Sequence, residues 1–359
     1  MSKERLTFRT ELFSRRESIA EKIEAALEDA ESSRVAVGGS ARGILQQVLN
    51  SQNEDKLFST GSVDLFFLSR PMTNTTFFVD LLAIGGAGPD EVLTSLSGVN
   101  SDAETFADKD DVKVKEAWLL RRLMGDHLMF VAGKLDLSNY FDRNEVANDE
   151  TTRFLNASLV NNPILQLPQN GPGLALRYEA GGAATWLLGF QSSEGKASGV
   201  ATKVLAIAEL DYRTRLLFSR LGNIRLWVKT GRLEGALEKK TYGSGLSFDQ
   251  QVTALSKVFV RYGLGKTEGT GKKEYAWSTG FEIKAPFEAF PRDRWGVGFS
   301  RERALTRSES LAETYYQHYL TDRLAVAFDL QWLFSGTNNI TGTKQDNIVL
   351  PGFRTTINF

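Results

Sequence analysis

The chain has 359 residues, a net charge of -1, a pI near 6.3 and a mean hydropathy of -0.25. It contains no cysteine, which excludes zinc ribbons, cysteine nucleophiles and disulfide scaffolds, and its balanced charge gives no general attraction to nucleic acid. No stretch reaches the roughly 18 apolar residues of a membrane-spanning helix, so any crossing of a bilayer must be made by strands.

The first segment is predicted to be helical. From Glu11 to about Ser32 the sequence lacks Gly and Pro and is rich in Glu, Ala, Arg and Lys. A short seam spaced by three and four residues runs through Leu12, Arg16, Ile19, Ile23, Ala26 and Ala30. It suits either an amphipathic helix lying on another part of the same molecule or a helix that self-associates.

A second helix is expected after the Gly-Gly-Ser sequence that begins at Gly38. Ser40 would cap it, and its apolar face would carry Ile44 and Val48 before it ends near Asn50. The polar run from Ser51 to Lys56 reads as a linker. We therefore expect residues 1–58 to form a helical segment and linker, and residues 59–359 to form a separate domain.

Beyond residue 58 the chain repeats segments of about ten residues in which apolar and polar side chains alternate. Examples are Val63–Phe67, Phe77–Leu81, Leu174–Tyr178, Trp186–Phe190, Trp277–Ile283 and Leu324–Trp332. The 32 glycines suit many turns, and the 8 prolines leave the strand ladders largely intact. So many strands predict an all-β fold, a transmembrane antiparallel β-barrel with a polar lumen.

Two segments resist this alternation. Glu116 falls on the face of Trp118, and Lys134 and Asp136 fall on the face of Phe130. Bulges or positions at the membrane interface would explain both.

The segment from Tyr140 to Gln169 is too long for a simple turn, and loops of this length tend to be functional. In a wide barrel it could fold inward and narrow the lumen. Asp142, Asn144, Asn148 and Glu150 are spaced like alternate ligands of a calcium loop, although Arg153 stands where the bidentate carboxylate should be. An ordinary hydrogen-bonded loop is the alternative.

Strand alternation predicts a lumenal face of mixed charge that would either contact solutes or merely hydrate and brace the wall. Trp227 on that face could offer a stacking surface to a sugar ring. The candidate pore-lining residues are Lys134, Asp136, Arg177, Glu179, Glu209, Asp211, Arg213, Arg225, Trp227, Arg261, Glu282, Asp329, Gln331 and Arg354.

The chain ends in an alternating strand, Gly352–Phe359, whose last residue is aromatic, as is usual for bacterial outer-membrane barrels. An exported barrel needs a signal peptide, yet residues 1–30 are charged throughout and contain no apolar run. We therefore interpret Met1 as the start of a mature or recombinant chain. Because barrels with an even number of strands have both termini in the periplasm, the helical segment is expected there, either as a plug or as an assembly helix.

Several motifs occur in one order along residues 110–359. They are AGKLDLSNYFDRNEVANDETTRFLN, GPGLALRY, LSFDQQVTALSKVFVRYGLG, STGFEIKAPFEAFPRDRWGVGFS, LAETYYQHYLTDRLAVAFDLQWLFSG and the closing LPGFR. In this order they resemble the carbohydrate-selective porin (OprB) family. The resemblance implies a barrel of about sixteen strands that has no cofactor and admits small sugars by diffusion.

An enzyme is not expected. His127 and His318 are the only histidines and neither lies in a recognisable catalytic setting; His318 is expected to be an interfacial wall residue.

The expected partners are small carbohydrates, the lipid bilayer with its lipopolysaccharide, and a second copy through the helical segment, but no nucleic acid. The alternative function is a structural envelope protein whose helices tether or oligomerise a barrel with little transport.

Overall fold

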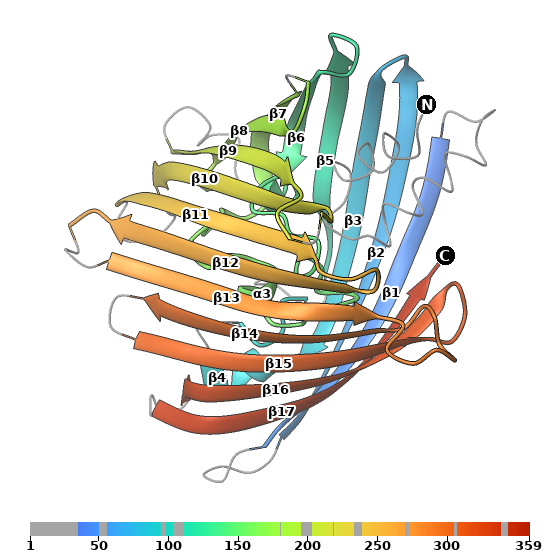
Figure 1. Ribbon diagram of the computed structural model, residues 1–359, viewed down its shortest axis with the longest axis vertical. Coiled ribbons are helices and arrows are strands. Elements are labelled where there is room, and N and C mark those ends of the chain that lie inside the picture. Colours follow the sequence, from blue (N-terminus) through green and yellow to red (C-terminus); the bar gives the residue numbers. More distant parts are fainter. Residues whose placement is uncertain are drawn as a thin grey trace.

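A computed structural model of the protein shows a wide barrel of long antiparallel strands (Figure 1). It describes residues 35–49, 56–94, 98–102, 111–179, 181–194, 203–217, 219–232, 239–269, 273–304, 307–338 and 344–359. The helix expected over Glu11–Ser32 lies outside these residues. Among the described residues, no helix has both the length and the apolar character needed to cross a bilayer.

The described elements occur in the following order along the chain. They are β1 (Val35–Val48), β2 (Lys56–Met72), β3 (Thr75–Ala87), the 3-10 helix η1 (Pro89–Glu91), β4 (Leu93–Thr94), β5 (Asp111–Leu123), β6 (Leu128–Leu135), the 3-10 helix η2 (Leu137–Asn139), α3 (Ala157–Val160), β7 (Gly171–Glu179), β8 (Ala184–Ser192), β9 (Val204–Thr214), β10 (Gly222–Arg232), β11 (Lys240–Gln251), β12 (Ser256–Thr267), β13 (Lys273–Lys284), β14 (Arg294–Ala304), β15 (Arg307–Tyr319), β16 (Leu324–Asn338) and β17 (Lys344–Asn358).

The sheet closes on itself. Strands that follow one another pair as antiparallel neighbours, and β1 pairs with both β2 and β17. The two-residue β4 only extends the end of β16, so sixteen of the seventeen described strands form the wall. The predicted all-β antiparallel barrel of about sixteen strands is confirmed.

The alternation seen in the sequence divides the two faces of the wall. Leu65 and Phe67 of β2 are exposed on the outside, whereas Asp64 and Phe66, which alternate with them, are buried on the inside. The same division recurs in the carboxy-terminal strand, where Ile357 points outward and Arg354 inward. Apolar side chains therefore form the outer belt that lipid requires, and polar groups gather inside.

The second predicted helix is wrong. Residues Val35–Val48 form β1, in which Ser40 and Ile44 lie on the buried face of the strand. The barrel thus begins well before residue 59. At the strand's start, the Gly39 N–H donates to the Phe359 carbonyl at 2.8 Å and the Phe359 N–H donates to Gly39 at 3.0 Å. Closure needs this strand because it satisfies the free edges of β2 and β17. The backbone hydrogen bonds gained by closure outweigh the weak helical pattern of this segment.

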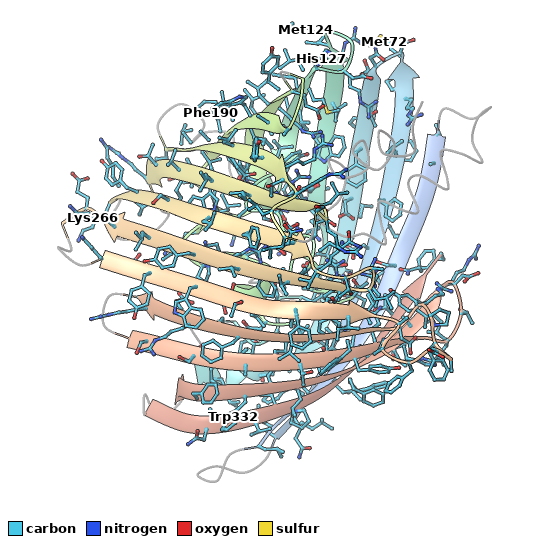
Figure 2. The ribbon with its side chains drawn as sticks, viewed as in Figure 1. Met72, Met124, His127, Phe190, Lys266 and Trp332 are labelled. Carbon is cyan, nitrogen blue, oxygen red and sulfur yellow. The ribbon has the colours of Figure 1, made fainter. Side chains whose placement is uncertain are left out.

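The two ends of the barrel differ. At the end that holds β1's first residue and Phe359, short turns join the strands, for example Thr73–Asn74 between β2 and β3. The long connection between β6 and β7 leaves from the other end. Figure 2 shows Met72, Met124 and His127 together at the short-turn end, and Lys266 at the far end of β12. We call these the turn end and the loop end.

The two anomalies of alternation have separate causes. Register shifts between β3 and β5 at Asp80 and Leu81, so Lys115 forms a bulge and both Lys115 and Glu116 are buried. The predicted bulge is confirmed there. In β6 the alternation is regular, and Lys134 shares the outer face with Phe130, where its Nζ donates to the Val114 carbonyl at 2.5 Å.

The turn between β13 and β14 folds against the outside of β15 through Asp293. Its carboxylate accepts from the Tyr316 hydroxyl at 2.5 Å and from the Tyr319 N–H at 3.2 Å, and lies 2.8 Å from His318 Nδ1. The rings of Phe290 and His318 meet edge to face at 4.9 Å. His318 is therefore a wall residue near the turn end, as expected.

We expect Asp293→Ala to lower the free energy of unfolding by about 1–3 kcal/mol, because it leaves several donors without their acceptor. Denaturant titration of the refolded barrel measures this. Asp322→Ala is the matched control, since its ion pair with Arg292 is exposed and should contribute little. Equal stabilities for the two variants would contradict the anchoring role of Asp293.

Candidate functional site

The connection between β6 and β7 folds into the lumen. Figure 1 shows α3 within the barrel, surrounded by strands. Almost every residue from Tyr140 to Val160 is buried. We call residues 136–170 the inward loop. The prediction that the segment from Tyr140 to Gln169 folds inward is confirmed.

Glycines on the inner face of the wall make room for the inward loop. A Cβ at Gly189 in β8 would lie 2.5 Å from the Phe141 ring, and one at Gly263 in β12 would lie 2.4 Å from Asn162 Oδ1. A Cβ at Gly298 in β14 would lie 3.0 Å from Leu159 and Phe154 carbons. The loop is therefore in direct contact with the wall backbone, and the glycines are a packing requirement.

Arg261 of β12 fastens the middle of the inward loop. Its guanidinium donates to the carbonyls of Ala147 and Leu159, each at 2.6 Å, and to that of Asp142 at 3.0 Å. It also pairs with the Asp142 carboxylate at 2.9 Å. Five directed donors in a rigid fork suit a cation that must satisfy several buried carbonyls at once.

Asp142 is the polar centre of the loop. Besides Arg261, its carboxylate accepts from Trp227 Nε1 at 2.8 Å and from the Asn162 N–H at 3.1 Å, which joins the loop's two halves. Burial raises the pKa of Asp142, while Arg261 and the hydrogen bonds from Trp227 and Asn162 act in the opposite direction.

Charged side chains of β15 and β17 bind the backbone of the later part of the inward loop. Arg354 of β17 donates to the carbonyls of Glu150 and Arg153 at 2.6 and 2.7 Å. Glu313 of β15 accepts the N–H groups of Leu155 and Asn156 at 2.6 and 2.9 Å. The inward loop thus follows the wall as far as the last strand.

The carboxylates of β9 and β11 bind the first part of the inward loop in the same way. Arg225 of β10 pairs with Asp211 at 3.2 Å and with Asp249 at 2.5 Å. Asp211 also pairs with Arg143 of the loop at 3.3 Å, and Glu209 accepts the Asp142 N–H at 2.6 Å. Charges on this part of the wall therefore neutralise one another beneath the loop.

A second segment, residues 98–102, enters the lumen beside the inward loop. Asn100 Nδ2 donates to Gln46 Oε1 at 2.7 Å, and the Asp102 carboxylate pairs with Arg42 at 3.1 Å. Gln331 Nε2 donates to the Val99 carbonyl at 2.9 Å. The Ala157 N–H reaches the Gly98 carbonyl at 2.8 Å, so the two segments brace each other.

Most of the predicted pore-lining residues do lie on the inner face, but they are buried by these contacts. This group comprises Arg177, Glu209, Asp211, Arg225, Trp227, Arg261, Glu282, Asp329, Gln331 and Arg354. Six of them contact the inward loop itself, namely Glu209, Asp211, Trp227, Arg261, Glu282 and Arg354. Gln331 contacts the Val99 carbonyl of the second segment. The bracing alternative describes them better than solute contact does.

Four predicted residues are less enclosed or differently placed. Glu179, whose carboxylate is one third exposed, pairs with Arg177 at 2.6 Å near the turn end, and Arg213 is partly exposed at the same end of β9. Asp136 follows β6 and caps η2 by accepting the Ser138 N–H. The assignment of Lys134 to the lumen is wrong, because regular alternation in β6 places it on the outer face.

Trp227 does not present a free ring face to the lumen. Only 1% of its surface is exposed, its Nε1 is bonded to Asp142, and a Cβ at Gly245 would lie 2.3 Å from the indole. The indole is packed between the wall and the inward loop. In this structure it positions Asp142 and offers no platform for a sugar.

The predicted calcium loop is not formed. Asn144 Oδ1 accepts the N–H groups of Val146 and Ala147, and Asn148 Oδ1 accepts from Arg261. Asp142 is paired with the same arginine, and Glu150 binds Arg354 through its backbone. The four residues therefore turn their oxygens to separate protein donors, and within the described residues no group of acidic or histidine side chains is placed to hold a metal.

A polar cavity of about 390 Å³ opens beside the inward loop. It lies toward the loop end, because Asp136 follows the end of β6 and Glu302 is near the end of β14. It is lined by Asp136, Ser138, Ala157, Ser158, Asn161, Asn162, Pro163, Leu165, Gln166, Leu167, Pro168 and Glu302. We call it the loop cavity. Its size suits a small polar solute.

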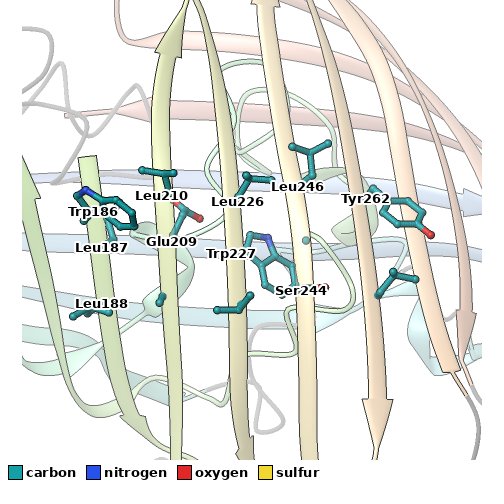
Figure 3. Close-up of a pocket in the computed structure, with 14 residues that line it drawn as sticks. Trp186, Leu187, Leu188, Glu209, Leu210, Leu226, Trp227, Ser244, Leu246 and Tyr262 are labelled. Atoms are coloured by element: carbon teal, nitrogen blue, oxygen red, sulfur yellow. The ribbon is translucent and has the colours of Figure 1, made fainter. Parts of the chain in front are cut away.

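A larger cavity of about 520 Å³ lies at the wall of β8–β12 (Figure 3). Its lining is mostly apolar and includes the outward-facing Trp186, Leu188, Leu226 and Tyr262. Side chains of this kind match the outer belt of the barrel, so this cavity faces the lipid and is a poor site for a hydrated solute.

The closed barrel, its polar interior and its inward loop form the architecture of an outer-membrane porin. Residues 218–359 match the profile of the family described as "Carbohydrate-selective porin, OprB family". This match confirms the predicted resemblance over that segment.

Solved structures of similar fold include a carbohydrate-porin relative and an outer membrane channel. The high-pH structure of Pseudomonas putida OprB superposes with a TM-score of 0.73 at 14% identity, covering 94% of this chain and 96% of that one. The outer membrane channel DcaP of Acinetobacter baumannii gives 0.57 at 12% identity, with 90% and 97% covered. An uncharacterized protein of Aquifex aeolicus (strain VF5) is 26% identical over 201 residues, which are 56% of this chain and 57% of that protein.

We expect Arg261→Met to release the inward loop, because it removes the donors of several buried carbonyls and leaves Asp142 buried without its cation. Removing one partner of a buried pair typically costs about 3–5 kcal/mol. The single-channel conductance in planar bilayers should rise and become noisier. Lys257→Met, on the same strand and in a partly exposed pair with Glu145, is the control. A variant with unchanged conductance would show that Arg261 does not hold the loop.

We expect Gly263→Ala to lower the free energy of unfolding by about 1–3 kcal/mol, since the new methyl group overlaps Asn162 and Ile164 of the loop. The temperature at which the folded band disappears on a semi-native gel measures the change. Gly43→Ala is the control, because a Cβ there meets no atom within 4 Å. Equal transition temperatures would refute close packing of loop and wall.

Proposed function

We propose that this porin admits small neutral solutes, sugars first, by passive diffusion past the inward loop. The observation that carries the proposal is a loop fixed across the lumen by paired charges, which narrows the passage while leaving little unbalanced charge. The description of the family that matches residues 218–359 supports carbohydrate as the solute class.

The electrostatics of the lumen favour uncharged solutes. Arg225 lies between Asp211 and Asp249, and Arg354 pairs with Asp329 at 3.1 Å. Because both arginines are matched by nearby carboxylates, an ion that passes them meets fields of both signs and gains little net attraction. A polyol instead finds donors and acceptors. The loop cavity, with Ser158 and Asn161 in its lining, is a suitable first contact.

Liposome swelling with sugars of graded size tests the proposal. We expect rapid swelling with monosaccharides, slower swelling with disaccharides, and much slower swelling with larger oligosaccharides, because the inward loop restricts the passage. The rival function, a structural envelope protein with little transport, predicts a barrel that passes no sugar. Exclusion of all sugars in the presence of measurable ion conductance would overturn sugar passage but leave the channel assignment intact.

The turn end is proposed to face the periplasm. Short turns on the periplasmic side and longer loops outside are the rule for outer-membrane barrels. Both the start of β1 and Phe359 lie at the turn end, so residues 1–34 would join the wall there. We infer that they form a periplasmic segment that either plugs the lumen mouth or assembles subunits.

Deletion of residues 1–34 separates these two roles, because the wall begins at Val35 and stays whole. A plug predicts higher conductance with an unchanged oligomeric mass, whereas an assembly helix predicts a fall in mass to that of the monomer. Planar-bilayer recording and light scattering in detergent provide the two readouts. A deletion variant identical to the full chain in both would exclude both roles.

A further inference from the structure

Basic side chains gather on the outside of the barrel at the loop end of β10–β14. Alternation places each of them on the outer face, in line with exposed apolar residues of its own strand, such as Leu264 below Lys266. Figure 2 shows Lys266 at the loop end of β12. The group, which we call the basic rim, comprises Arg232, Lys240, Lys266, Lys273, Arg301 and Arg303.

Register sets like charges of the basic rim opposite one another. Arg232 is the direct cross-strand partner of Lys240, and Lys266 is that of Lys273. Like charges directly opposite each other destabilise a sheet. Within the described part of the chain, none of the six forms an ion pair. The only exposed carboxylate nearby in the described residues is that of Glu268, in the turn after β12.

Two other basic residues at the loop end are paired with carboxylates. Lys56 of β2 lies 3.8 Å from the Glu91 carboxylate, and Lys203 before β9 lies 2.5 Å from that of Glu194. Within the described residues, the charges of the basic rim have no such carboxylate partner and are available to a counter-ion from outside the chain.

An aromatic band lies directly beneath the basic rim on the same face. Tyr242 is one alternation below Lys240, and Tyr262 lies below Lys266 in β12. In β13 and β14 the rings of Trp277 and Phe299 stand 5.2 Å apart; Trp277 is the cross-strand partner of Arg301, and Phe299 is one alternation below Arg301. Aromatic girdles mark the level of lipid headgroups in such barrels, so the basic rim lies at or just above the headgroups.

We propose that the basic rim binds the phosphate groups of lipopolysaccharide in the outer leaflet. Phosphates at headgroup height meet cations that have no ion-pair partner among the described residues, and three arginines add bidentate donors. Bound phosphate also relieves the repulsion between Lys266 and Lys273. This assignment rests on the proposed orientation, in which the loop end faces outward, and does not depend on the solute that the lumen admits.

Binding is measured with the full chain in a neutral detergent, by thermophoresis against purified lipopolysaccharide and against the same lipid after removal of its phosphates. Each basic residue near an anionic surface contributes a factor of about five. We expect Lys266→Gln with Lys273→Gln to weaken binding by roughly twenty-fold. Lys56→Gln with Lys203→Gln, which removes two paired charges at the same end, should leave the affinity unchanged.

Lys266→Glu separates loss of the site from loss of the fold. It places opposite charges across the register with Lys273, so the barrel in lipid-free detergent should gain thermal stability while its lipopolysaccharide binding falls. Equal binding of the dephosphorylated lipid, or equal binding by the double variant and its control, would overturn the proposal.

Labelling in intact cells tests the orientation on which the assignment rests. Lys266→Cys introduces the only thiol of the chain. It should react with a membrane-impermeant maleimide without permeabilisation of the cells. Reaction only after permeabilisation would place the basic rim in the periplasm and overturn the assignment. Sugar flux in liposomes of neutral lipid is independent of all these outcomes, so failure here and failure of the proposed function are distinguishable.

Discussion

Closure of the sheet is the constraint on which this molecule depends. In a bilayer, a strand edge without partners leaves N–H and C=O groups that water cannot satisfy. The chain meets this requirement by pairing β1 with β17, and the backbone of Gly39 with that of Phe359. Once closed, the wall has an outside that must be apolar and an inside that is free to carry charge.

That freedom is used mainly to hold the inward loop. A loop crossing a barrel carries many backbone groups that must be satisfied away from bulk water. Arg261 and Arg354 donate to its carbonyls, while Glu313 and Glu209 accept its N–H groups. The wall charges thus act as ligands of the loop backbone, and the size of the passage follows from their positions.

The outer face differs from the lumen in how its charges are paired. Inside the barrel, Arg225, Arg261 and Arg354 are each matched by a carboxylate of the same chain. On the outer face at the loop end, Lys266 and Lys273 oppose one another, and no described residue supplies a carboxylate to either. In a membrane protein, charged lipid headgroups can supply the counter-ions, because they are always present around the barrel.

The sequence by itself determined the barrel, the division between its faces and the place of His318 in the wall, because a period of two depends only on neighbouring residues. It also indicated that the segment from Tyr140 to Gln169 could fold inward. It further contained a signal for packing of the inward loop against the wall. Gly243 and Gly245, like Gly263 and Gly265, are two residues apart and so share the inner face, where the absence of a side chain leaves room. Only the tertiary structure decided that Ser40–Val48 is a strand, that Trp227 is covered, and that the oxygens of Asp142 and Asn148 meet Arg261 and no cation. These outcomes depend on partners about 80 to more than 300 residues away in the chain, and no local pattern specifies which distant groups closure will bring together.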